Sequence, residues 1–557
     1  MTEQGAPFLD SYFSRFLAER SGLSGVEKER FRQLVKKLTA AHEAGHSCLP
    51  VPEMESRFLR TLHLVSDGGQ TPLVLHDDKL YLHRYFHYET RLAEQIRTLA
   101  AVCFPGKGHE KLLDAFFDDD EPGLPGLNRQ KEAAGSALQK ALTIICGGPG
   151  TGKTTTVVHI LALLFMTTDR KLDVALAAPT GKAARRLSQS IGGSLDRLPL
   201  PVEVKAAIPT EAKTLHRLLG FIRHSPQFRH NRQQPMGWDV VVVDEASMVD
   251  LAMMSKLVDA LKPGARLLLL GDKDQLASVE SGAVLGDFIQ SLPDNTIELK
   301  KTYRFDDNIK FLAESVNAGD SDGAWACLSD PNRVNVTVLQ TELLDFIGRQ
   351  YTGYMASVYR YPQTGVREIF AAFHRFQVLC AIHYGNRGVA GINRGVETFL
   401  ARRGFDCRPD SWYPGRPVLI TRNEYSLDLF NGDIGICLPD FADGTSRVWF
   451  ERSDGSLRSY SPYRLPGCET VFAMTIHKSQ GSEFDEVVVV LPEEDNRILS
   501  RELLYTAFTR ARKMVKLVAG RQVFAQALSR KIERCSGLAD LLQEQTQKYG
   551  KSVRLNE

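Results

Sequence analysis

The sequence predicts an α/β protein with two parallel sheets, and three features support this prediction. An apolar stretch at residues 142–146 runs into a glycine-rich string at residues 147–154, and an apolar helical pattern follows. Four consecutive valines, residues 240–243, end in two carboxylates. Further apolar strands follow in the C-terminal half, at residues 378–382, 471–475, 487–490 and 515–518. Apolar strands that alternate with helical segments are typical of parallel sheets covered by helices on both faces.

The glycine-rich string has the pattern of a phosphate-binding loop. Its glycines let backbone N–H groups turn toward phosphates, Lys153 reaches the β and γ phosphates, and the Thr154 hydroxyl is placed to ligate magnesium. The helix that begins there adds its positive N-terminal dipole. A glycine-rich turn that matches by chance is the alternative, and the strand before it and the helix after it argue against that. The residues expected to bind a nucleoside triphosphate are Gly147, Gly148, Pro149, Gly150, Thr151, Gly152, Lys153 and Thr154.

Length and composition limit the possible classes of protein. With 557 residues the chain is too long for one hydrophobic core, so two to four domains are expected. The net charge is only +2, so any nucleic-acid binding must use a local groove. No apolar run approaches the about 18 residues of a membrane span, and the N-terminus does not read as a signal peptide. We therefore expect a cytoplasmic protein with no membrane partner.

The cysteines and histidines do not predict a metal site. The nine cysteines are scattered singly from Cys48 to Cys535, with no C-x-x-C pair, which indicates reduced thiols. His42, His46 and Cys48 could form one corner of a zinc site, but no second ligand pair is evident downstream. A packed helix end is the favoured interpretation, and no zinc is predicted.

Residues 1–115 predict a mainly helical N-terminal domain, because apolar positions recur at helical spacing at 8–17 and 31–41. Residues 80–88 interleave aromatic and basic side chains that could stack on single-stranded DNA. We favour a strand leading into a helix that packs in this domain or against a partner. The acidic, breaker-rich stretch at residues 116–126 predicts a linker.

Polar side chains that could take part in nucleotide binding or hydrolysis follow the strands of the first sheet. Asp244 is suited to hold magnesium and Glu245 to orient or deprotonate the attacking water. Gln275 follows the strand at 267–270 and could sense the γ phosphate. Gln130, upstream of the phosphate loop, could offer a donor and an acceptor to an adenine edge, and Arg304 could stabilise charge that develops on the γ phosphate.

Nucleic-acid contacts are expected where strands of the parallel sheets end. Thr180 and Lys182 follow the strand at residues 174–178, and His216 lies in a later Thr-Leu-His-Arg string; these residues could hold a phosphate backbone. For the neighbouring Arg185 and Arg186, a solvated basic helix face is a serious alternative. The candidates for DNA contact are Thr180, Lys182, His216, His477 and Lys478.

The second half adds its own motifs. Short, turn-rich strand candidates between about residues 412 and 470 predict a small inserted β-barrel. Polar strings follow at residues 475–484 and 504–512, and Arg510 is a forked donor suited to a phosphate across a cleft. We therefore expect the nucleotide to lie between two halves that close and open with hydrolysis.

These strings, in order, resemble the motifs of superfamily 1 helicases. The form Thr-x-His-Lys-Ser-Gln-Gly at residues 475–481 resembles the 5′→3′ branch of that superfamily. Further strings near residues 46, 80 and 429 make the chain similar, over essentially its full length, to the alpha subunits of bacterial exodeoxyribonuclease V. The motif strings are GGPGTGKTTT, APTGKAARRL, TLHRLLG, VVVDEASM, LLGDKDQLASVESG, KTYRF, TIHKSQGSEFDEV and LYTAFTRARK, and the further strings are GHSCLP, LYLHRYFHYE and LFNGDIG.

The resemblance implies an architecture and an activity. Two RecA-like motor domains, residues 127–325 and 326–557, would carry an SH3-like β-barrel at about 412–470. The activity would be that of a DNA-dependent ATPase and 5′→3′ DNA helicase in double-strand-break repair, with ATP and Mg²⁺ as cofactors. The partners would be the 5′-ended single strand at duplex ends and the beta and gamma subunits, RecB and RecC, with the N-terminal domain docked on the gamma subunit.

The resemblance also assigns a role to each motif residue. Residues 147–154 would bind ATP and magnesium, and Gln130 would contact adenine. Asp244 and Glu245 would form the metal and catalytic-base pair, and Gln275 would couple the two sites. The arginine fingers would be Arg304 and Arg510.

Other functions are also considered. A free-standing helicase of this family carries a larger N-terminal extension, whereas here only about 120 residues precede the motor. A phosphate-loop kinase or clamp-loader-like ATPase has no need of the strings at 475–484 and 504–512. A mainly structural ATP-binding subunit is disfavoured because the motor residues are intact, namely Lys153, Asp244, Glu245 and Arg510. No nuclease carboxylate cluster is evident, so any exonuclease activity would belong to the assembly.

Overall fold

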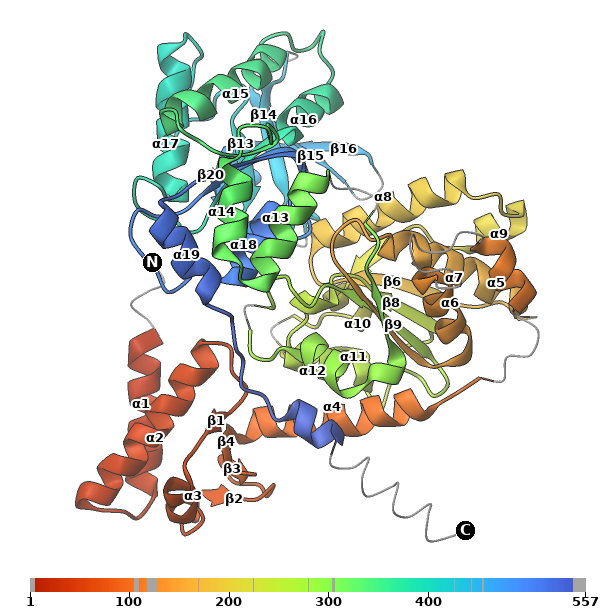
Figure 1. The fold of residues 1–557 in the computed structure, drawn as a ribbon, viewed down its shortest axis with the longest axis vertical. Helices are drawn as coiled ribbons and strands as arrows, with labels where there is room; N and C mark the ends of the chain where they lie inside the picture. Colours follow the sequence, from red (N-terminus) through yellow and green to blue (C-terminus); the bar gives the residue numbers. More distant parts are fainter. Residues whose placement is uncertain are drawn as a thin grey trace.

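The computed structural model describes residues 6–104, 110–117, 128–168, 170–223, 225–278, 280–302, 306–424, 426–441, 443–452 and 455–543. Within these ranges the strands form two parallel sheets, which confirms the predicted α/β class, and two smaller sheets that are mainly antiparallel. Figure 1 shows the N-terminal module at the lower left, the six-stranded parallel sheet at the right, and the second parallel sheet with the small inserted sheet above.

The first parallel sheet has six strands in the order β10-β5-β9-β8-β6-β7. Its strands are largely apolar because both faces are covered: Val240 and Val242 of β8 face one core, and Val241 and Val243 face the other. Its strands are β5 (Leu142–Gly147), β6 (Val174–Ala178), β7 (Ala212–Thr214), β8 (Val240–Val243), β9 (Arg266–Gly271) and β10 (Thr296–Leu299). One face is covered by α5 (Glu110–Phe116), α6 (Arg129–Gln139), α7 (Lys153–Thr167), α8 (Gly181–Arg197) and α9 (Val202–Ala207). The other is covered by α4 (His83–Ala101), α10 (Leu215–Leu219), α11 (Leu251–Asp259) and α12 (Val284–Ser291). We call this sheet and its helices the first half.

The second parallel sheet has five strands in the order β11-β20-β19-β12-β18 and encloses a core of its own. Its strands are β11 (Val336–Val338), β12 (Phe376–Cys380), β18 (Ala473–Thr475), β19 (Phe484–Val490) and β20 (Ala511–Val518). Its helices are α13 (Asp307–Ala318), α14 (Ser321–Ser329), α15 (Leu343–Val358), α16 (Val366–His374), α17 (Val389–Arg402), α18 (Arg501–Phe508) and α19 (Arg521–Ser529). We call this sheet, its helices and the insertion below the second half.

The boundary between the halves lies earlier in the chain than predicted. Helix α13 buries Ile309, Leu312 and Val316 in the core of the second sheet, so the second half begins before residue 307 and not at residue 326. In the Gly/Asp-rich string at residues 319–323, residues 319 and 320 form a tight turn between α13 and α14, and residues 321–323 begin α14. Gly319 ends α13 with a φ of 73°. Turn residues therefore marked a helix end here and not a domain end.

The predicted insertion is a five-stranded antiparallel sheet with a small core of its own, in the order β16-β15-β14-β13-β17. Its strands are β13 (Pro417–Ile420), β14 (Ile434–Pro439), β15 (Ser446–Glu451), β16 (Leu457–Tyr460) and β17 (Cys468–Thr470). All of them lie inside the predicted span of residues 412–470. Their likeness to an SH3 barrel stays a prediction.

The N-terminal module combines helices with a four-stranded sheet of very short strands. Its helices are α1 (Ala6–Arg20), α2 (Gly25–Glu43) and α3 (Glu53–Leu59), and its strands are β1 (Leu49–Pro50), β2 (Val65–Ser66), β3 (Leu73–His76) and β4 (Lys79–Leu82). As predicted, β4 leads directly into α4, which packs against α11 and so attaches the module to the first half. No helix within the described ranges is both long enough and apolar enough to cross a bilayer.

The C-terminal segment returns to the first half, although residues 326–557 were predicted to form one unit. After α19 the chain runs down to lie beside α4, as the dark-blue trace in Figure 1 shows. Leu538, Leu541 and Leu542 are buried in the core that α4 shares with the first sheet. We call residues 530–543 the C-terminal strap.

The strap is anchored on Glu89 of α4, whose side chain is 0% exposed. The Glu89 carboxylate accepts hydrogen bonds from the Ser47 and Ser536 hydroxyls and from the Gly537 N–H. Burial of the carboxyl raises its pKa, while these donors act in the opposite direction. One buried side chain therefore joins the module, the first half and the strap.

We expect Glu89→Ala to lower the free energy of unfolding by about 3 kcal/mol, because three donors around a buried carboxylate would lose their acceptor. Glu94→Ala, an exposed position on the same helix, is the control and should change stability little. The measurement is equilibrium unfolding in urea, combined with limited proteolysis of the strap. Equal stability of the two variants would show that Glu89 does not anchor the strap.

Candidate nucleotide and nucleic-acid sites

The phosphate loop lies at the carboxyl edge of the first sheet, between β5 and α7. Gly150 and Gly152 adopt positive φ values of 80° and 84°, a conformation that a residue with a Cβ rarely adopts. The Lys153 ammonium donates to the carbonyls of Gly147 (2.6 Å) and Gly148 (3.0 Å), so its charge sits at the loop itself. The Gln130 amide donates to the Thr151 carbonyl at 3.4 Å and so also touches the loop.

A cavity of about 90 Å³ brings most of the predicted nucleotide residues together. Both halves line it. Asp244, Glu245 and Gln275 come from the ends of β8 and β9, and Arg510 comes from the second half. The loop contributes Pro149, Gly150, Gly152, Lys153 and Thr154. Arg304 lies outside the described residues.

The two acids at the end of β8 differ in their surroundings. Burial and the neighbouring Glu245 raise the pKa of Asp244 to about 6, while the Lys153 charge opposes the shift. Glu245 has a φ of 52°, an uncommon conformation for a residue other than glycine, and such strain gathers at functional sites. The Asp244 carboxylate and the Thr154 hydroxyl line the same cavity and are oxygen ligands of the kind that Mg²⁺ prefers.

Arg510 is held by its own half. Its side chain is 1% exposed, and its guanidinium donates to the carbonyls of Thr506 (3.0 Å) and Ser482 (3.3 Å). This anchoring fixes the direction of a positive group that lines the same cavity as the phosphate loop. Sequence analysis considered Arg186 only beside the DNA contacts, but it also lines the nucleotide cavity and lies 4.0 Å from a Glu245 oxygen.

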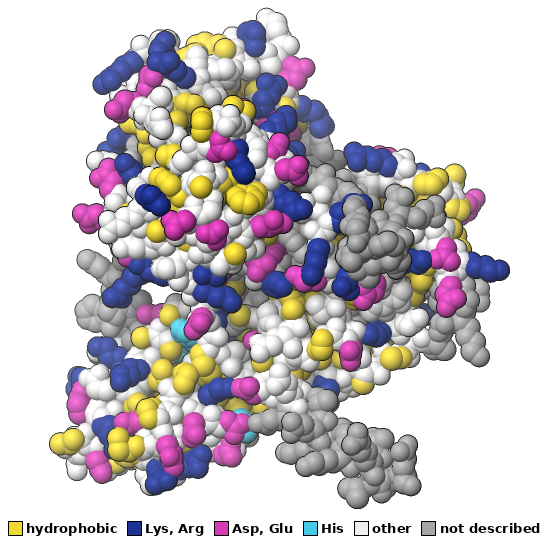
Figure 2. Space-filling model, in the orientation of Figure 1, with side chains coloured by type: hydrophobic (Ala, Val, Ile, Leu, Met, Phe, Trp, Pro, Cys, Tyr) yellow, Lys and Arg dark blue, Asp and Glu magenta, His cyan; other side chains and the backbone are white. Residues whose placement is uncertain are grey.

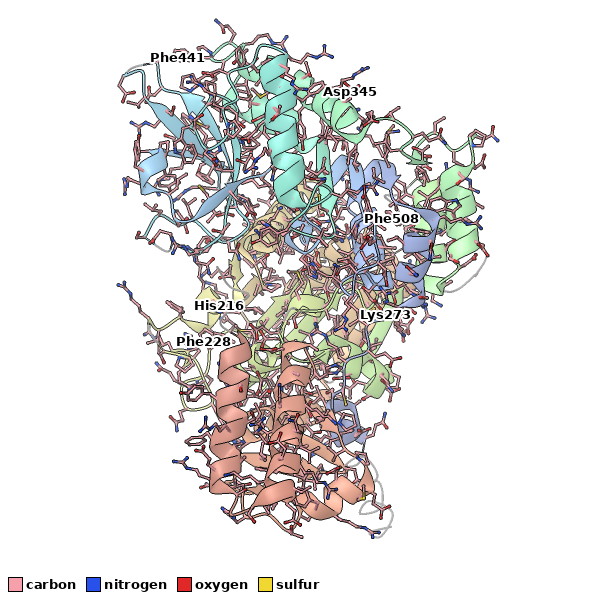
Figure 3. The ribbon with its side chains drawn as sticks, turned by 90° about the vertical axis from the view of Figure 1, so that its left-hand side faces the viewer. His216, Phe228, Lys273, Asp345, Phe441 and Phe508 are labelled. Atoms are coloured by element: carbon pink, nitrogen blue, oxygen red, sulfur yellow. The ribbon has the colours of Figure 1, made fainter. Side chains whose placement is uncertain are left out.

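The residues predicted to contact DNA do not gather on one open surface. Thr180 caps α8 by accepting a hydrogen bond from Ala183 N. The Lys182 Nζ is buried and has no hydrogen-bond partner among the described residues; burial and the nearby Arg185 lower the pKa of Lys182 to about 7. The His216 ring packs edge-on against Phe228 at 5.5 Å, and burial lowers its pKa (Figure 3).

The other two candidates are also engaged within the protein. Burial lowers the pKa of His477, and the Lys478 ammonium forms an ion pair with Glu469 at 2.5 Å. On the face shown in Figure 2, basic and acidic side chains are interspersed, in keeping with the net charge of +2. Basic side chains also gather at the contact between the halves.

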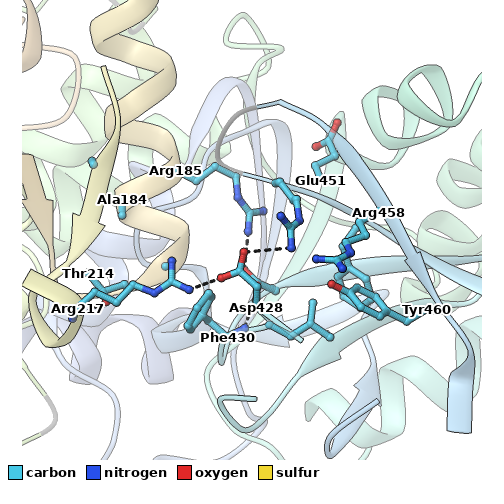
Figure 4. Close-up of a pocket in the computed structure, with 15 residues that line it drawn as sticks. Ala184, Arg185, Thr214, Arg217, Asp428, Phe430, Glu451, Arg458 and Tyr460 are labelled. Atoms are coloured by element: carbon cyan, nitrogen blue, oxygen red, sulfur yellow. Dashed lines mark hydrogen bonds and ion pairs between the residues drawn. The ribbon is translucent and has the colours of Figure 1, made fainter. Parts of the chain in front are cut away.

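That contact is lined by arginines paired with carboxylates (Figure 4). We call it the seam: α8 and α10 of the first half against residues 428–433 and Glu483 of the second. Arg185 pairs with Asp433 at 2.7 Å, and Arg186 pairs with Glu483. The interpretation of these arginines as a solvated helix face is therefore wrong.

The same arrangement continues around Asp428. This carboxylate pairs with Arg217 of α10 and with Arg452 of the insertion, and the Phe430 ring lies 4.5 Å from the Arg217 guanidinium. The string LFNGDIG at residues 429–435 was the sequence signal for this loop. Arginines suit phosphates as well as carboxylates, so a nucleic-acid backbone would compete with the acids of the seam.

The metal prediction can be compared with the structure at one point. His46 Nδ1 accepts from Cys535 N at 2.8 Å, and the Cys48 and Cys535 sulfurs lie 3.3 Å apart. Across the described ranges, no group of three or more His, Cys, Asp or Glu side chains could hold a metal ion. His46 and Cys48 thus contact the strap.

The geometry defines a class of protein: a phosphate-loop nucleoside triphosphatase whose site is completed by an arginine from the half with the second parallel sheet. Two family models match the chain, an AAA domain over residues 130–281 and a UvrD-like helicase C-terminal domain over residues 470–518. The chain is 40% identical over 501 residues to the RecBCD enzyme subunit RecD of Mycolicibacterium smegmatis, which covers 88% of this chain and 87% of that protein. The chain belongs to the RecD family.

Two further similarities are more distant. The ATP-dependent RecD2 DNA helicase of Deinococcus radiodurans is 32% identical over 453 residues, which cover 78% of this chain and 54% of that protein. The solved structure of the Pif1 helicase from Candida albicans is 18% identical, with a TM-score of 0.41, over 78% of this chain and 100% of that chain.

We expect Asp428→Asn to tighten binding of single-stranded DNA about two- to fivefold at low salt, because it frees Arg217 and Arg452 from a partly exposed ion pair. Asn tolerates the left-handed backbone at this position, where φ is 58°. Asp443→Asn, an exposed acid of the insertion, is the control. The measurement is fluorescence anisotropy of a labelled oligo(dT) over a salt series, and weaker binding would contradict the role of the seam.

Proposed function

We propose that this chain is an ATP-dependent 5′→3′ DNA helicase motor and the alpha-type subunit of a heterotrimeric helicase–nuclease that processes double-strand DNA ends. The observation that carries the proposal is the cavity between the halves, where the phosphate loop, the acids of β8 and Arg510 meet. Membership of the RecD family supports it, since relatives in that family are named as RecBCD enzyme subunits.

The side chains around the cavity divide the chemistry of hydrolysis. The phosphate-loop amides and Lys153 hold the phosphates, and Thr154 with Asp244 would hold Mg²⁺, which neutralises charge on the phosphate oxygens when bound. Glu245 orients the attacking water and takes its proton. Gln275 faces the γ phosphate, and Arg510 stabilises the charge that develops there. Arg304, in the same proposal, is a second arginine finger.

Movement follows because the site spans both halves. Binding of ATP favours closure by drawing Arg510 and the phosphate loop onto one ligand, and hydrolysis removes that advantage. The seam lies on the same contact, so closure and opening also change the exposure of Arg185, Arg186 and Arg217. We propose that the motor steps along DNA because the closed and open arrangements of the halves bind the strand differently.

The proposal includes partners and location. The N-terminal module, with the exposed Tyr12 and Met54, would dock on the gamma subunit RecC, and the complex would include the beta subunit RecB. The insertion would be SH3-like, and the protein would be cytoplasmic, without zinc or a membrane partner. DNA contacts would involve the backbone and stacking, because a translocating motor gains little from reading base edges.

We expect the purified chain to displace the strand from a partial duplex with a 5′ single-stranded tail and not from one with a 3′ tail. Lys153→Gln should lower DNA-stimulated ATP hydrolysis at least about 100-fold, because it removes a charged donor to the phosphates. Lys171→Gln, an exposed lysine of the same half, is the control. Full ATPase activity in Lys153→Gln would overturn the motor assignment, and unwinding from the 3′ tail would overturn the polarity.

We also expect the isolated chain, supplied with magnesium and ATP, to unwind weakly and to leave labelled DNA uncut. The physical reason is that, over the described residues, no cluster of carboxylates and histidines is arranged to hold catalytic metal ions outside the nucleotide cavity. Gel analysis of end-labelled duplex and single strands tests this. Metal-dependent cleavage that disappears when a carboxylate of this chain is changed would overturn the expectation.

A further inference from the structure

A buried hydrogen-bond network connects the two halves at the loop that follows β9. The Asp272 carboxylate is 2% exposed, and one of its oxygens accepts both from the Gln275 amide at 2.9 Å and from the Tyr505 hydroxyl at 3.1 Å. Its other oxygen accepts from Asp274 N at 3.0 Å. Gln275 belongs to the first half and Tyr505 to α18 of the second. Asp272 therefore accepts from both residues only when the two halves are in contact.

Two further hydrogen bonds fix the same loop against the second half. The Leu276 N–H donates to the Thr506 hydroxyl at 3.0 Å, and the Leu276 carbonyl accepts from the Gln480 amide at 2.9 Å. The Leu276 side chain is buried in the core of the second sheet. The residue directly after Gln275 is therefore held on three sides by the half that supplies Arg510.

The Tyr505 ring reaches from α18 to the phosphate loop. A Cβ placed on Gly148 would lie 3.0 Å from the Tyr505 hydroxyl oxygen, so the ring tip packs directly against the loop backbone. Tyr505 also lines a cavity of about 350 Å³ together with Gly147, Gly148 and Asp272. Burial and the adjacent Asp272 charge raise the pKa of Tyr505, which keeps the phenol protonated as a donor.

When the halves are closed, these contacts restrict the Gln275 side-chain amide to one favourable orientation. With Tyr505 present, the shared Asp272 oxygen is fixed in position by two donors, and the Gln275 side chain is fixed with it. Without the phenol, Asp272 keeps its charge but loses the donor that exists only in the closed arrangement. Loss of such positioning lowers the rate of a chemical step more than it lowers substrate binding.

We infer that Tyr505 is a positioning residue for ATP hydrolysis: its hydroxyl, through Asp272, orients Gln275 toward the γ phosphate when the halves close. This role rests on the proposed function, since it presupposes DNA-stimulated hydrolysis of ATP in this cavity. Nucleotide binding itself depends on the phosphate loop, so the role predicts a change in kcat and not in KM.

The test is steady-state ATP hydrolysis by the full chain, with and without oligo(dT), in Tyr505→Phe. We expect kcat in the presence of DNA to fall about tenfold, because a lost positioning contact acts on the chemical step, with KM for ATP within about twofold of the wild type. Tyr354→Phe is the matched control, since it removes a buried hydroxyl that donates to the Gly415 carbonyl at 2.9 Å, in the core of the second half. That control should keep both constants.

A double variant separates positioning from general damage. In a Gln275→Ala background, Tyr505→Phe should cause no further loss of kcat, because both changes remove the same interaction. The role would be overturned if the losses of kcat from the two single substitutions multiply in the double variant. A kcat of Tyr505→Phe equal to that of Tyr354→Phe would also overturn it. If Tyr505→Phe does not fold, Asp272→Asn is measured in the same way. An unchanged kcat in that variant would overturn the role as well.

The wild-type reaction separates this role from the function on which it rests. A wild-type chain without DNA-stimulated hydrolysis would overturn the proposed function and this role together. A stimulated wild type with an unaffected Tyr505→Phe would overturn the role alone.

Discussion

The chemistry available to this chain depends on one contact, the packing of α18 from the second half against the loop after β9 in the first. Leu276 is the centre of that contact, because its side chain lies in the second core while its backbone follows Gln275. The phosphate loop and the acids at the end of β8 all belong to the first half. In the proposed cycle, Arg510 and Tyr505 approach the nucleotide only when this contact is made, so hydrolysis requires closure.

The seam adds ion pairs to this contact, but these pairs contribute little to the free energy of unfolding. Arg185 and Asp433 are largely removed from water, and the cost of that removal offsets much of their attraction. Such pairs fix the orientation of the arginine side chain, because a guanidinium fork fits only a few arrangements of oxygen atoms. Under the proposed function, the same arginines would exchange their carboxylate partners for phosphates of the DNA backbone.

The sequence predicted what is encoded in consecutive residues and missed what distant segments build together. The strand, loop and helix around Lys153 are contiguous, as are the valines before Asp244, so their elements and their common edge of the sheet followed from pattern alone. The pairing of Arg185 with Asp433 joins residues far apart in the chain, and helix amphipathicity cannot distinguish water from a carboxylate as the neighbour. Lys182 was expected to contact a phosphate backbone, but its ammonium is buried and lies 6.0 Å from the Phe484 ring of the second half, a neighbour far away in the sequence.

The strap could not be predicted from the sequence for a different reason, and its contacts bear on how the halves are held together. Residues 530–543 carry no motif, yet the Arg534 guanidinium donates to the carbonyls of Glu280 at 2.7 Å and Gly282 at 2.9 Å, and Gly282 N donates to the Gly45 carbonyl of the N-terminal module. The loop after β9 is thus held at its start by α18 and at its end by the strap and the module. Contact between the halves and docking of the strap therefore act on the same loop, in which Gln275 directly precedes Leu276, the residue that α18 holds.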